Sequence, residues 1–313
     1  MEIIRGFHNL QPQHRGCVAT VGNYDGVHLG HQRVLTELKQ RAMALGLPTV
    51  VVTFEPTPQE YLAPDSAPAR LSRLREKIAL LAEQGVDRLL VLRFAQSLAQ
   101  TEPEDFILRL LVDGLGVRHL VVGDDFRFGR ARRGDYAMLA KAGQDHRYTL
   151  ESMATYLVNG ARASSSRLRQ ALSTGDLVLT QQLLGRPYRL SGRVIRGQQL
   201  GRQLGYPTAN IALHRLKSPL QGIFAVRVHG LSGGPHNGVA SIGTRPTVDD
   251  DPNWLLEVHL FDADGDMYDQ YLEVEFLHYL RNEERFDSLE ALKIQMDLDA
   301  DNARRYFVTA RKP

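Results

Sequence analysis

The order of apolar segments in the first half of the chain restricts the fold more than any other sequence feature. β-Branched and other apolar runs at residues 17–21, 50–54, 89–92 and 120–122 alternate with longer segments whose apolar residues recur at helical spacing. The first of these longer segments ends at Gly46, a residue typical of helix C-termini. Strands that alternate with helices pair in parallel, so the pattern predicts a doubly wound, Rossmann-like α/β domain.

The second half of the chain has a different pattern. Between residues 188 and 280 the apolar runs are short and are separated by Gly, Pro, Asn and Asp residues. Several such strands without an intervening helix predict a small closed or nearly closed β-barrel. A terminal helix is expected to begin at Asp287, because Glu290 follows three residues later as in a capping box. The expected fold class is therefore α/β plus β, with a helix after the barrel.

Length, charge and cysteine content limit the class of protein. A chain of 313 residues suffices for two domains of ~150 residues each, and a Gly-Arg-Pro sequence predicts the junction between domains 1–184 and 185–313. The formal net charge is +2, which gives no overall field to attract nucleic acid. A single cysteine, Cys17, excludes an intrachain disulfide and a cysteine zinc cage. No apolar run approaches the ~18 residues of a membrane-spanning helix, so we expect a cytoplasmic protein that binds neither nucleic acid nor membrane.

A histidine-containing loop, residues 22–31, joins the first predicted strand to the first predicted helix. Ligands of parallel sheets bind beyond the carboxyl ends of the strands, and helix N-termini favour anions. His28 and His31 lie three residues apart on one face of the helix start, so both can donate hydrogen bonds to phosphate oxygens. The spacing alone favours structural histidines or a weak metal site, but the position after the first strand, the flanking glycines and a second anion site described next favour phosphate binding. The further candidate nucleotide-binding residues of this loop are Gly22, Asn23, Asp25 and Gly30.

A serine-rich segment begins a later predicted helix of the first half. In the sequence Ser-Ser-Ser-Arg-Leu-Arg at residues 164–169, Ser164 and Ser165 offer hydroxyl and N–H groups to a phosphate. Arg169 adds a cation. Taken alone, the segment fits an ordinary capped helix with solvated arginines at least as well.

The loop after the fourth predicted strand, residues 123–129, carries further polar and aromatic groups. Asp125 is a hydrogen-bond acceptor, and the ring of Phe128 can stack on a planar ligand. Arginines recur through residues 127–133, but the basic run is short and has few interleaved aromatics, which disfavours a nucleic-acid patch.

A glycine-rich segment of the second half, residues 197–210, ends in Pro-Thr-Ala-Asn. It is not a Walker A motif, since no Gly-Lys-Ser/Thr follows. Gly201 and Gly205 permit close approach of the backbone to a ligand, and Thr208 and Asn210 offer neutral oxygens suited to Mg²⁺. The glycine pattern alone is more typical of a Gly-rich hairpin with a proline turn.

Glu257 lies in a predicted strand, residues 255–260, whose inward-facing positions are ambiguous. A glutamate that points into a site can act as general base for a hydroxyl that attacks a γ-phosphate. The commoner alternative is a strand glutamate exposed to solvent.

These motifs together resemble a known family. The loop at residues 22–31 and the serine-rich segment are similar to the two motifs of the His-x-Gly-His nucleotidyltransferase superfamily, in which Arg169 is the matching arginine. The whole chain resembles the bacterial bifunctional riboflavin kinase/FMN adenylyltransferase family, since the Pro-Thr-Ala-Asn motif after Leu-Gly-aromatic is specific to the flavokinase module. Tyr24 and Tyr206 stand where that family frequently has Phe.

The resemblance implies two reactions that use ATP with Mg²⁺. The barrel would phosphorylate riboflavin to FMN, and the α/β domain would adenylylate FMN to FAD with release of pyrophosphate. By the resemblance, Thr208 and Asn210 hold Mg²⁺-ATP, Glu257 is the kinase base, and the adenylyl donor's phosphates are held by His28, His31, Ser164 and Arg169. It also implies, less directly, ligand contacts by Asn23 and Asp125, flavin walls at Phe54 and Phe128, and closure of the barrel site by Arg281.

Three alternative functions are compatible with parts of the sequence. The first is a flavokinase whose nucleotidyltransferase domain is decayed or regulatory, which the intact histidine motif disfavours. The second is an adenylyltransferase for another phosphorylated vitamin, which leaves the second half unexplained. The third is a flavin-binding carrier, which would require neither two separate phosphate sites nor Glu257. The sequence does not indicate an oligomeric state.

Overall fold

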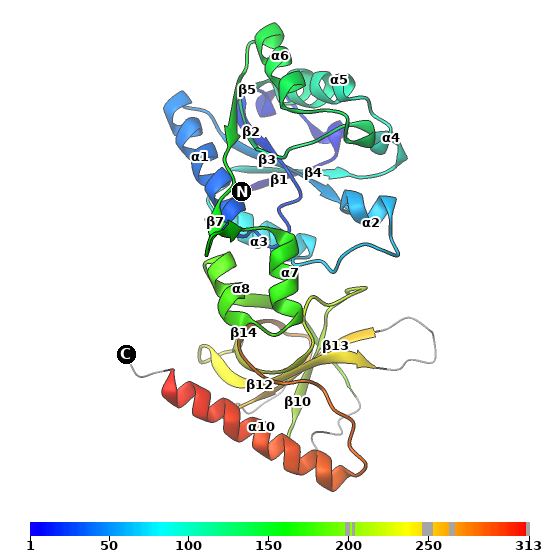
Figure 1. The fold of residues 1–313 in the computed structure, drawn as a ribbon, viewed down its shortest axis with the longest axis vertical. Helices are drawn as coiled ribbons and strands as arrows, with labels where there is room; N and C mark the ends of the chain where they lie inside the picture. The colour runs from blue at the N-terminus through cyan, green and yellow to red at the C-terminus, as the bar shows by residue number, and fades with distance from the viewer. Residues whose placement is uncertain (198–200, 202–203, 246–252, 263–266, 311–313) are drawn as a thin grey trace. The chain divides into compact units, whose positions relative to one another are not determined.

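The computed structural model describes residues 1–197, 201, 204–245, 253–262 and 267–310 (Figure 1). The chain divides into two compact units, each with its own sheet. The first comprises Met1–Pro68 and Ser72–Ser164, and the second comprises Ala69–Leu71 and Ser165–Pro313. Over the residues described, none of the helices combines the length and apolar character needed to cross a membrane.

The first unit is built on a six-stranded sheet in the order β1-β4-β3-β2-β5-β6, and all of its strand pairs are parallel. The strands are β1 (Glu2–Arg5), β2 (Cys17–Val21), β3 (Thr49–Glu55), β4 (Arg88–Arg93), β5 (Val117–Gly123) and β6 (Thr149–Met153). A short hairpin, β7 (Leu157–Val158) with β8 (Ala161–Arg162), follows the sheet. The predicted doubly wound α/β domain is thus confirmed.

Helices connect the strands of the first unit. The longer ones are α1 (Leu29–Leu45), α3 (Leu74–Glu83), the π-helical η3 (Ile107–Gly114) and α6 (Tyr136–His146). The shorter ones are η1 (Phe7–Asn9), η2 (Pro12–His14), α2 (Pro58–Leu62), α4 (Gln96–Ala99), α5 (Pro103–Phe106) and η4 (Arg130–Arg132). Helix α1 ends at Gly46 with a left-handed backbone (φ +63°), as the sequence predicts.

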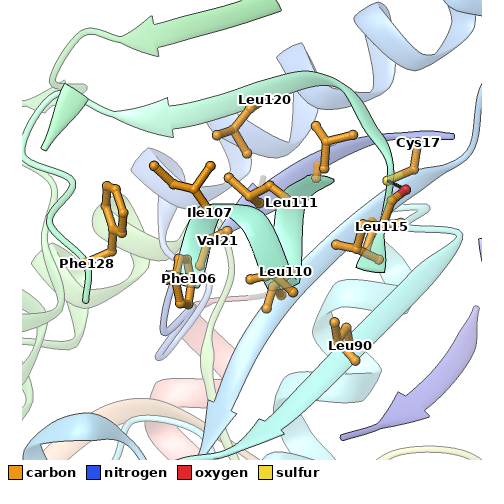
Figure 2. Close-up of a cluster of buried hydrophobic side chains, with 14 of the residues drawn as sticks. Cys17, Val21, Leu90, Phe106, Ile107, Leu110, Leu111, Leu115, Leu120 and Phe128 are labelled. Atoms are coloured by element: carbon orange, nitrogen blue, oxygen red, sulfur yellow. Dashed lines mark hydrogen bonds between the residues drawn. The ribbon is translucent and has the colours of Figure 1, made fainter. Parts of the chain in front are cut away.

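Apolar side chains cover both faces of this sheet. Along β2, Cys17, Ala19 and Val21 face the cluster formed with α5, η3 and α6, which Figure 2 shows around Phe106 and Leu110. Val18 faces the opposite cluster, formed with α1 and α3. A parallel sheet buried on both faces requires strands that are apolar at nearly every position, which is what the β-branched runs supply.

The second unit contains a closed six-stranded barrel in the order β10-β13-β12-β11-β14-β9, in which neighbouring strands are antiparallel. The strands are β9 (Tyr188–Ile195), β10 (Thr208–Ala212), β11 (Gly222–His229), β12 (His236–Arg245), β13 (Asn253–Leu260) and β14 (Tyr271–Arg281). Helices α7 (Ser165–Ser173) and α8 (Leu177–Leu184) precede the barrel. The predicted barrel is confirmed.

The terminal helix α10 (Leu289–Thr309) lies along the outside of the barrel (Figure 1). It begins one residue later than the sequence suggested: the N-cap is Ser288, not Asp287, because the Ser288 hydroxyl accepts from the amide of Ala291 at 3.1 Å. Glu290 lies in the first turn, where a negative charge is favourable. The buried face of α10 packs Ala300, Ala303 and Phe307 against Ala225 and Phe261 of the barrel.

Candidate active sites

Two stacked imidazoles form the start of helix α1. His28 is the N-cap, and its Nδ1 accepts from the backbone amide of His31 at 3.3 Å. The two rings are 3.7 Å apart between centroids and nearly parallel, at 18°. A side chain on Gly30 would crowd the His28 ring at 3.1 Å and the carbonyl of Ala163 at 3.2 Å. A neutral His28 ring therefore carries its proton on Nε2.

His31 is held neutral by its surroundings. Burial lowers its pKa well below the usual value, and the nearby His28, Lys77 and Arg162 lower the pKa further. Tyr24 packs on the other side of the ring, with centroids 4.9 Å apart. Among the described residues, His31 Nδ1 has no hydrogen-bond partner, which leaves a polar atom for a ligand.

The loop before α1 is braced by Ser72, which precedes helix α3 by two residues. The Asp25 carboxylate accepts from the amide of Ser72 at 2.9 Å, and the amide of Gly26 donates to the Ser72 hydroxyl at 3.0 Å. Asp25 is 6% exposed. The structure therefore places this predicted nucleotide-binding residue in hydrogen bonds that join the loop to the segment before α3. At the start of the loop, Gly22 donates from its amide to the carbonyl of Val52 on β3 at 3.0 Å.

A buried lysine reaches the same loop. Lys77 of α3 is 1% exposed, and its Nζ lies 3.4 Å from the hydroxyl of Thr53. Thr53 in turn donates to the carbonyl of Asn23 at 3.3 Å. The lysine therefore supports the Asn23 turn through Thr53 while its charge acts on His31.

The predicted flavin residues of the first unit have different environments. Asp125 accepts from Arg162 at 2.6 Å on the exposed hairpin side. Phe54 is partly buried, with its ring edge-on to Phe94 at 5.9 Å. Phe128 is 6% exposed and packs in the core cluster against Phe106. Of these three residues, Asp125 and Phe54 thus present more surface to a ligand than Phe128 does.

The serine-rich segment crosses the division of the chain into units. Ser164 ends the first unit, whereas Ser165 begins α7 in the second. Arg169 also belongs to the second unit, where its Nε donates to the carbonyl of Ala69 at 2.6 Å.

The second candidate site is a cavity of about 580 Å³ between the outer wall of the barrel and α10. It is lined by four of the predicted site residues, Gly201, Thr208, Glu257 and Arg281. The remaining lining side chains come mostly from the segment after β14 and from α10. They include Glu283, Phe286, Ser288, Leu292, Met296 and Asp299.

Glu257 faces this cavity, which settles the orientation that the sequence left ambiguous. On β13 it lies between Asn210 of β10 and Ser241 of β12. Its neighbours Leu256 and Val258 are fully buried in the barrel. Side chains alternate along a strand, so Glu257 lies on the outer face that α10 covers.

Thr208 and Asn210 lie on the same face of β10, two residues apart. Asn210 is 5% exposed, and within the described part of the chain its Oδ1 has no hydrogen-bond partner. A side chain on Gly197 would contact the Asn210 amide at 2.5 Å. An unpaired buried amide oxygen beside a threonine hydroxyl fits a hard cation such as Mg²⁺.

The glycine-rich segment makes a tight turn before β10. The amides of Leu204 and Tyr206 both donate to the carbonyl of Gly201, at 3.1 and 2.7 Å. Gly205 adopts a left-handed backbone (φ +87°), which favours glycine. The Tyr206 hydroxyl donates to Asp297 of α10, and burial with this carboxylate raises its pKa to about 12.

Two family models match the chain, one for each half. The FAD synthetase model matches residues 10–167, and the riboflavin kinase model matches residues 184–307. A bifunctional riboflavin kinase/FMN adenylyltransferase from Pseudomonas fluorescens is 51% identical over 304 residues, which covers 97% of each chain. That from Escherichia coli (strain K12) is 48% identical over 98% of each chain. The chain belongs to the bifunctional riboflavin kinase/FMN adenylyltransferase family.

A solved structure extends the likeness to the fold. A chain described as a macrolide-efflux protein from Streptococcus pneumoniae matches with a TM-score of 0.82 and 27% identity, covering 97% of this chain and 99% of that one. The description as an efflux protein belongs to that chain. The assignment to the riboflavin kinase/FMN adenylyltransferase family rests on the two family models and the full-length relatives.

Three residues near the family's motifs were not predicted from the sequence. Lys77 and Arg162 lie close enough to lower the pKa of His31, and Asp299 pairs with Arg281 in the barrel cavity. Lys77 and Asp299 occur in helical segments where charged residues are usually solvated, and nothing local marks their burial. Arg162 precedes the serine-rich motif by two residues, which is the one signal that could have drawn attention to it.

Proposed function

We propose that this chain makes FAD from riboflavin in two ATP-dependent steps. Residues 185–313 phosphorylate riboflavin to FMN and release ADP, and residues 1–184 adenylylate FMN to FAD and release pyrophosphate. The observation that carries the proposal is that each half matches a different family model, FAD synthetase over residues 10–167 and riboflavin kinase over residues 184–307. Riboflavin, FMN, FAD and ATP are accordingly the ligands.

In the kinase step, Glu257 acts as the general base. Its carboxylate takes the proton of the ribityl hydroxyl as the hydroxyl oxygen bonds to the γ-phosphorus of ATP. The bond from that phosphorus to the β,γ-bridging oxygen breaks, and ADP leaves. The position of Glu257 in the cavity wall, opposite Asn210, supports this role.

The metal of the kinase step is Mg²⁺, held by the Thr208 hydroxyl and the Asn210 amide oxygen together with the ATP phosphates. The unpaired, buried Oδ1 of Asn210 supports this assignment. When bound, Mg²⁺ neutralises charge on the β- and γ-phosphates. Gly201 and Gly205 bring the backbone close to the nucleotide, and Arg281, which lines the cavity, closes the site.

In the adenylyl step, an oxygen of the FMN phosphate bonds to the α-phosphorus of ATP as the bond to the α,β-bridging oxygen breaks. Pyrophosphate leaves, and no covalent intermediate with the protein is required. His28 donates from Nε2 to the phosphates, and the neutral His31 beside it positions the donor nucleotide. The other phosphate-binding residues of this step are Gly22, Asn23, Gly30, Ser164, Ser165 and Arg169, and Asp25 shapes their loop.

The flavin of the adenylyl step is bound by Phe54 and Asp125, whereas the buried ring of Phe128 packs against Phe106 and Phe126. The enzyme acts in the cytoplasm, where ATP is available and where a free, buried thiol such as Cys17 persists. It uses neither nucleic acid nor membrane as a partner, in keeping with its net charge of +2.

Product analysis tests the proposal directly. Purified protein is incubated with riboflavin, ATP and Mg²⁺, and the flavins are separated by chromatography over time. FMN that appears first and then converts to FAD supports both steps. If riboflavin is converted only to FMN, and FMN supplied as substrate is not converted to FAD, the single-activity alternative is supported. Riboflavin that is bound but never phosphorylated supports the flavin carrier.

A further inference from the structure

A buried ion pair joins the end of β14 to helix α10 inside the barrel cavity. Arg281 donates from Nε to both carboxylate oxygens of Asp299, at 2.9 and 3.1 Å, and from Nη2 to Oδ2 at 2.7 Å. The Asp299 side chain is 6% exposed, and both residues line the cavity. A carboxylate that meets two nitrogens of a planar guanidinium fixes its orientation as well as its position.

Three further contacts hold this pair in one geometry. Gln295, one turn earlier on α10, donates to Asp299 Oδ1 at 3.0 Å. Arg281 Nη1 donates to the carbonyl of Asn282 at 2.8 Å, and the guanidinium carbon lies 5.7 Å from the centre of the Phe286 ring. A guanidinium has five N–H groups. The bonds to described residues engage three of them, which leaves one N–H on each terminal nitrogen for an anion.

Fastening α10 to the barrel does not account for this pair, because the helix has other attachments. Its apolar face packs Ala300 and Phe307 against the barrel, and Asp297 accepts from the Tyr206 hydroxyl. A buried ion pair adds little net stability, since desolvation of both charges offsets their attraction. The burial of Asp299 at the cavity wall is better explained by control of where the Arg281 guanidinium points.

We propose that Asp299 is a positioning residue for phosphoryl transfer, acting through Arg281. It holds the guanidinium so that the two remaining N–H groups meet the phosphoryl group as it passes from ATP to the ribityl hydroxyl. That group carries its charge on three equatorial oxygens, and donors oriented in advance stabilise this charge without rearrangement during the reaction. The inference rests on the proposed kinase activity of the barrel.

The variant Asp299→Asn tests this role, because it preserves size and removes the charge that orients the guanidinium. We expect kcat for FMN formation to fall about 10- to 100-fold, with the KM for riboflavin unchanged. Asp301→Asn, an exposed acid on the same helix, is the matched control and should keep both constants. FAD formation from supplied FMN, measured in the same preparations, should be unchanged in both variants.

A double-mutant cycle separates positioning from a general structural effect. If Asp299 acts through Arg281, Asp299→Asn should lower kcat for FMN formation by less than about twofold when Arg281 is already replaced by Lys. If the kcat losses of the two single variants multiply in the double variant, the proposal is overturned. A wild-type kcat for the Asp299→Asn protein overturns it as well. Wild-type protein that makes no FMN contradicts the kinase assignment itself, so the two failures are distinguishable.

Discussion

Asn210 of β10 and Glu257 of β13 lie directly opposite each other in the antiparallel barrel. Opposite residues of such a pair share one face of the sheet, with Cβ atoms ~5 Å apart. The residue proposed to hold the metal therefore lies on the same face of the barrel as the proposed base, which lines the cavity. Every described residue that lines this cavity belongs to the second unit, so we expect that each reaction can be disabled without the other.

Glu257→Gln should abolish FMN formation while leaving FMN adenylylation intact. The amide keeps the size of the side chain and cannot take the proton of the ribityl hydroxyl, so we expect a loss of roughly 10²- to 10⁴-fold in kcat. Chromatography of reactions started with riboflavin or with FMN measures the two steps separately. Glu290→Gln, an exposed change on α10, is the control. Normal riboflavin phosphorylation by Glu257→Gln would mean that another residue is the base.

Thr208→Val should raise the Mg²⁺ concentration needed for FMN formation. The substitution is nearly isosteric and removes one of the two oxygens that we assign to the metal, so half-maximal activity should require about tenfold more Mg²⁺ or greater. A Mg²⁺ titration of initial rates measures this, and chelation by EDTA should stop the reaction in the unchanged protein. Thr244→Val, an exposed threonine on β12, is the control. An unaltered titration curve for Thr208→Val places the metal elsewhere.

The fold could be predicted because its signals are local. Along β2 every residue except Thr20 is apolar, and the structure buries alternate residues in two different clusters, as a sheet covered on both faces requires. The sequence marked Gly30 as a candidate nucleotide-binding residue, and the structure shows that the absence of a side chain there also makes room for the His28 ring and the Ala163 carbonyl.

The orientation and burial of side chains that contact residues distant in the sequence could not be predicted. The orientation of Glu257 was ambiguous because β13 is covered on both faces, by the barrel core and by α10, so polarity does not alternate cleanly. Lys77 occupies an ordinary helical position, and its burial depends on Thr53 from another strand. In the sequence, Asp299 is likewise one of several acidic residues of a charged helix. Its pairing with Arg281 depends on β14, which is distant in the sequence.

His28→Ala should abolish FAD formation and leave FMN formation unchanged. It removes the Nε2 donor and the N-cap of α1 together, and loss of one such donor to a charged transition state costs about 10²- to 10³-fold in kcat. Rates of FAD formation from supplied FMN measure the effect. His146→Ala, which removes an exposed imidazole from α6, should behave like the unchanged protein. Full FAD synthesis by His28→Ala contradicts the site assignment.

The stability of the first unit should depend on pH through His31. Burial lowers its pKa well below the usual value, whereas in the unfolded chain it titrates near ~6.5. Below that pH the unfolded state therefore binds more protons than the folded state. The contribution of His31 to the free energy of unfolding is greatest above pH ~6.5 and decreases as the pH drops towards the folded pKa. Denaturant unfolding at pH 7.5 and 5.5 should show a smaller difference for His31→Gln than for the unchanged protein. His119, whose pKa burial also lowers, contributes in the same direction to both proteins. Equal pH dependence in the two contradicts a neutral, buried His31.

Lys77→Met should raise the pKa of His31. Methionine fills a similar volume without the positive charge, and the lysine is one of the charges that hold the imidazole neutral. Titration of the His31 ring followed by NMR measures the shift directly, and the acid limb of FAD formation should move to higher pH with it. Lys141→Met, a change at a lysine side chain that is 79% exposed, should leave the titration where it is. An unchanged His31 titration in Lys77→Met would show that burial and the remaining charges suffice, and that Lys77 serves the loop only through Thr53.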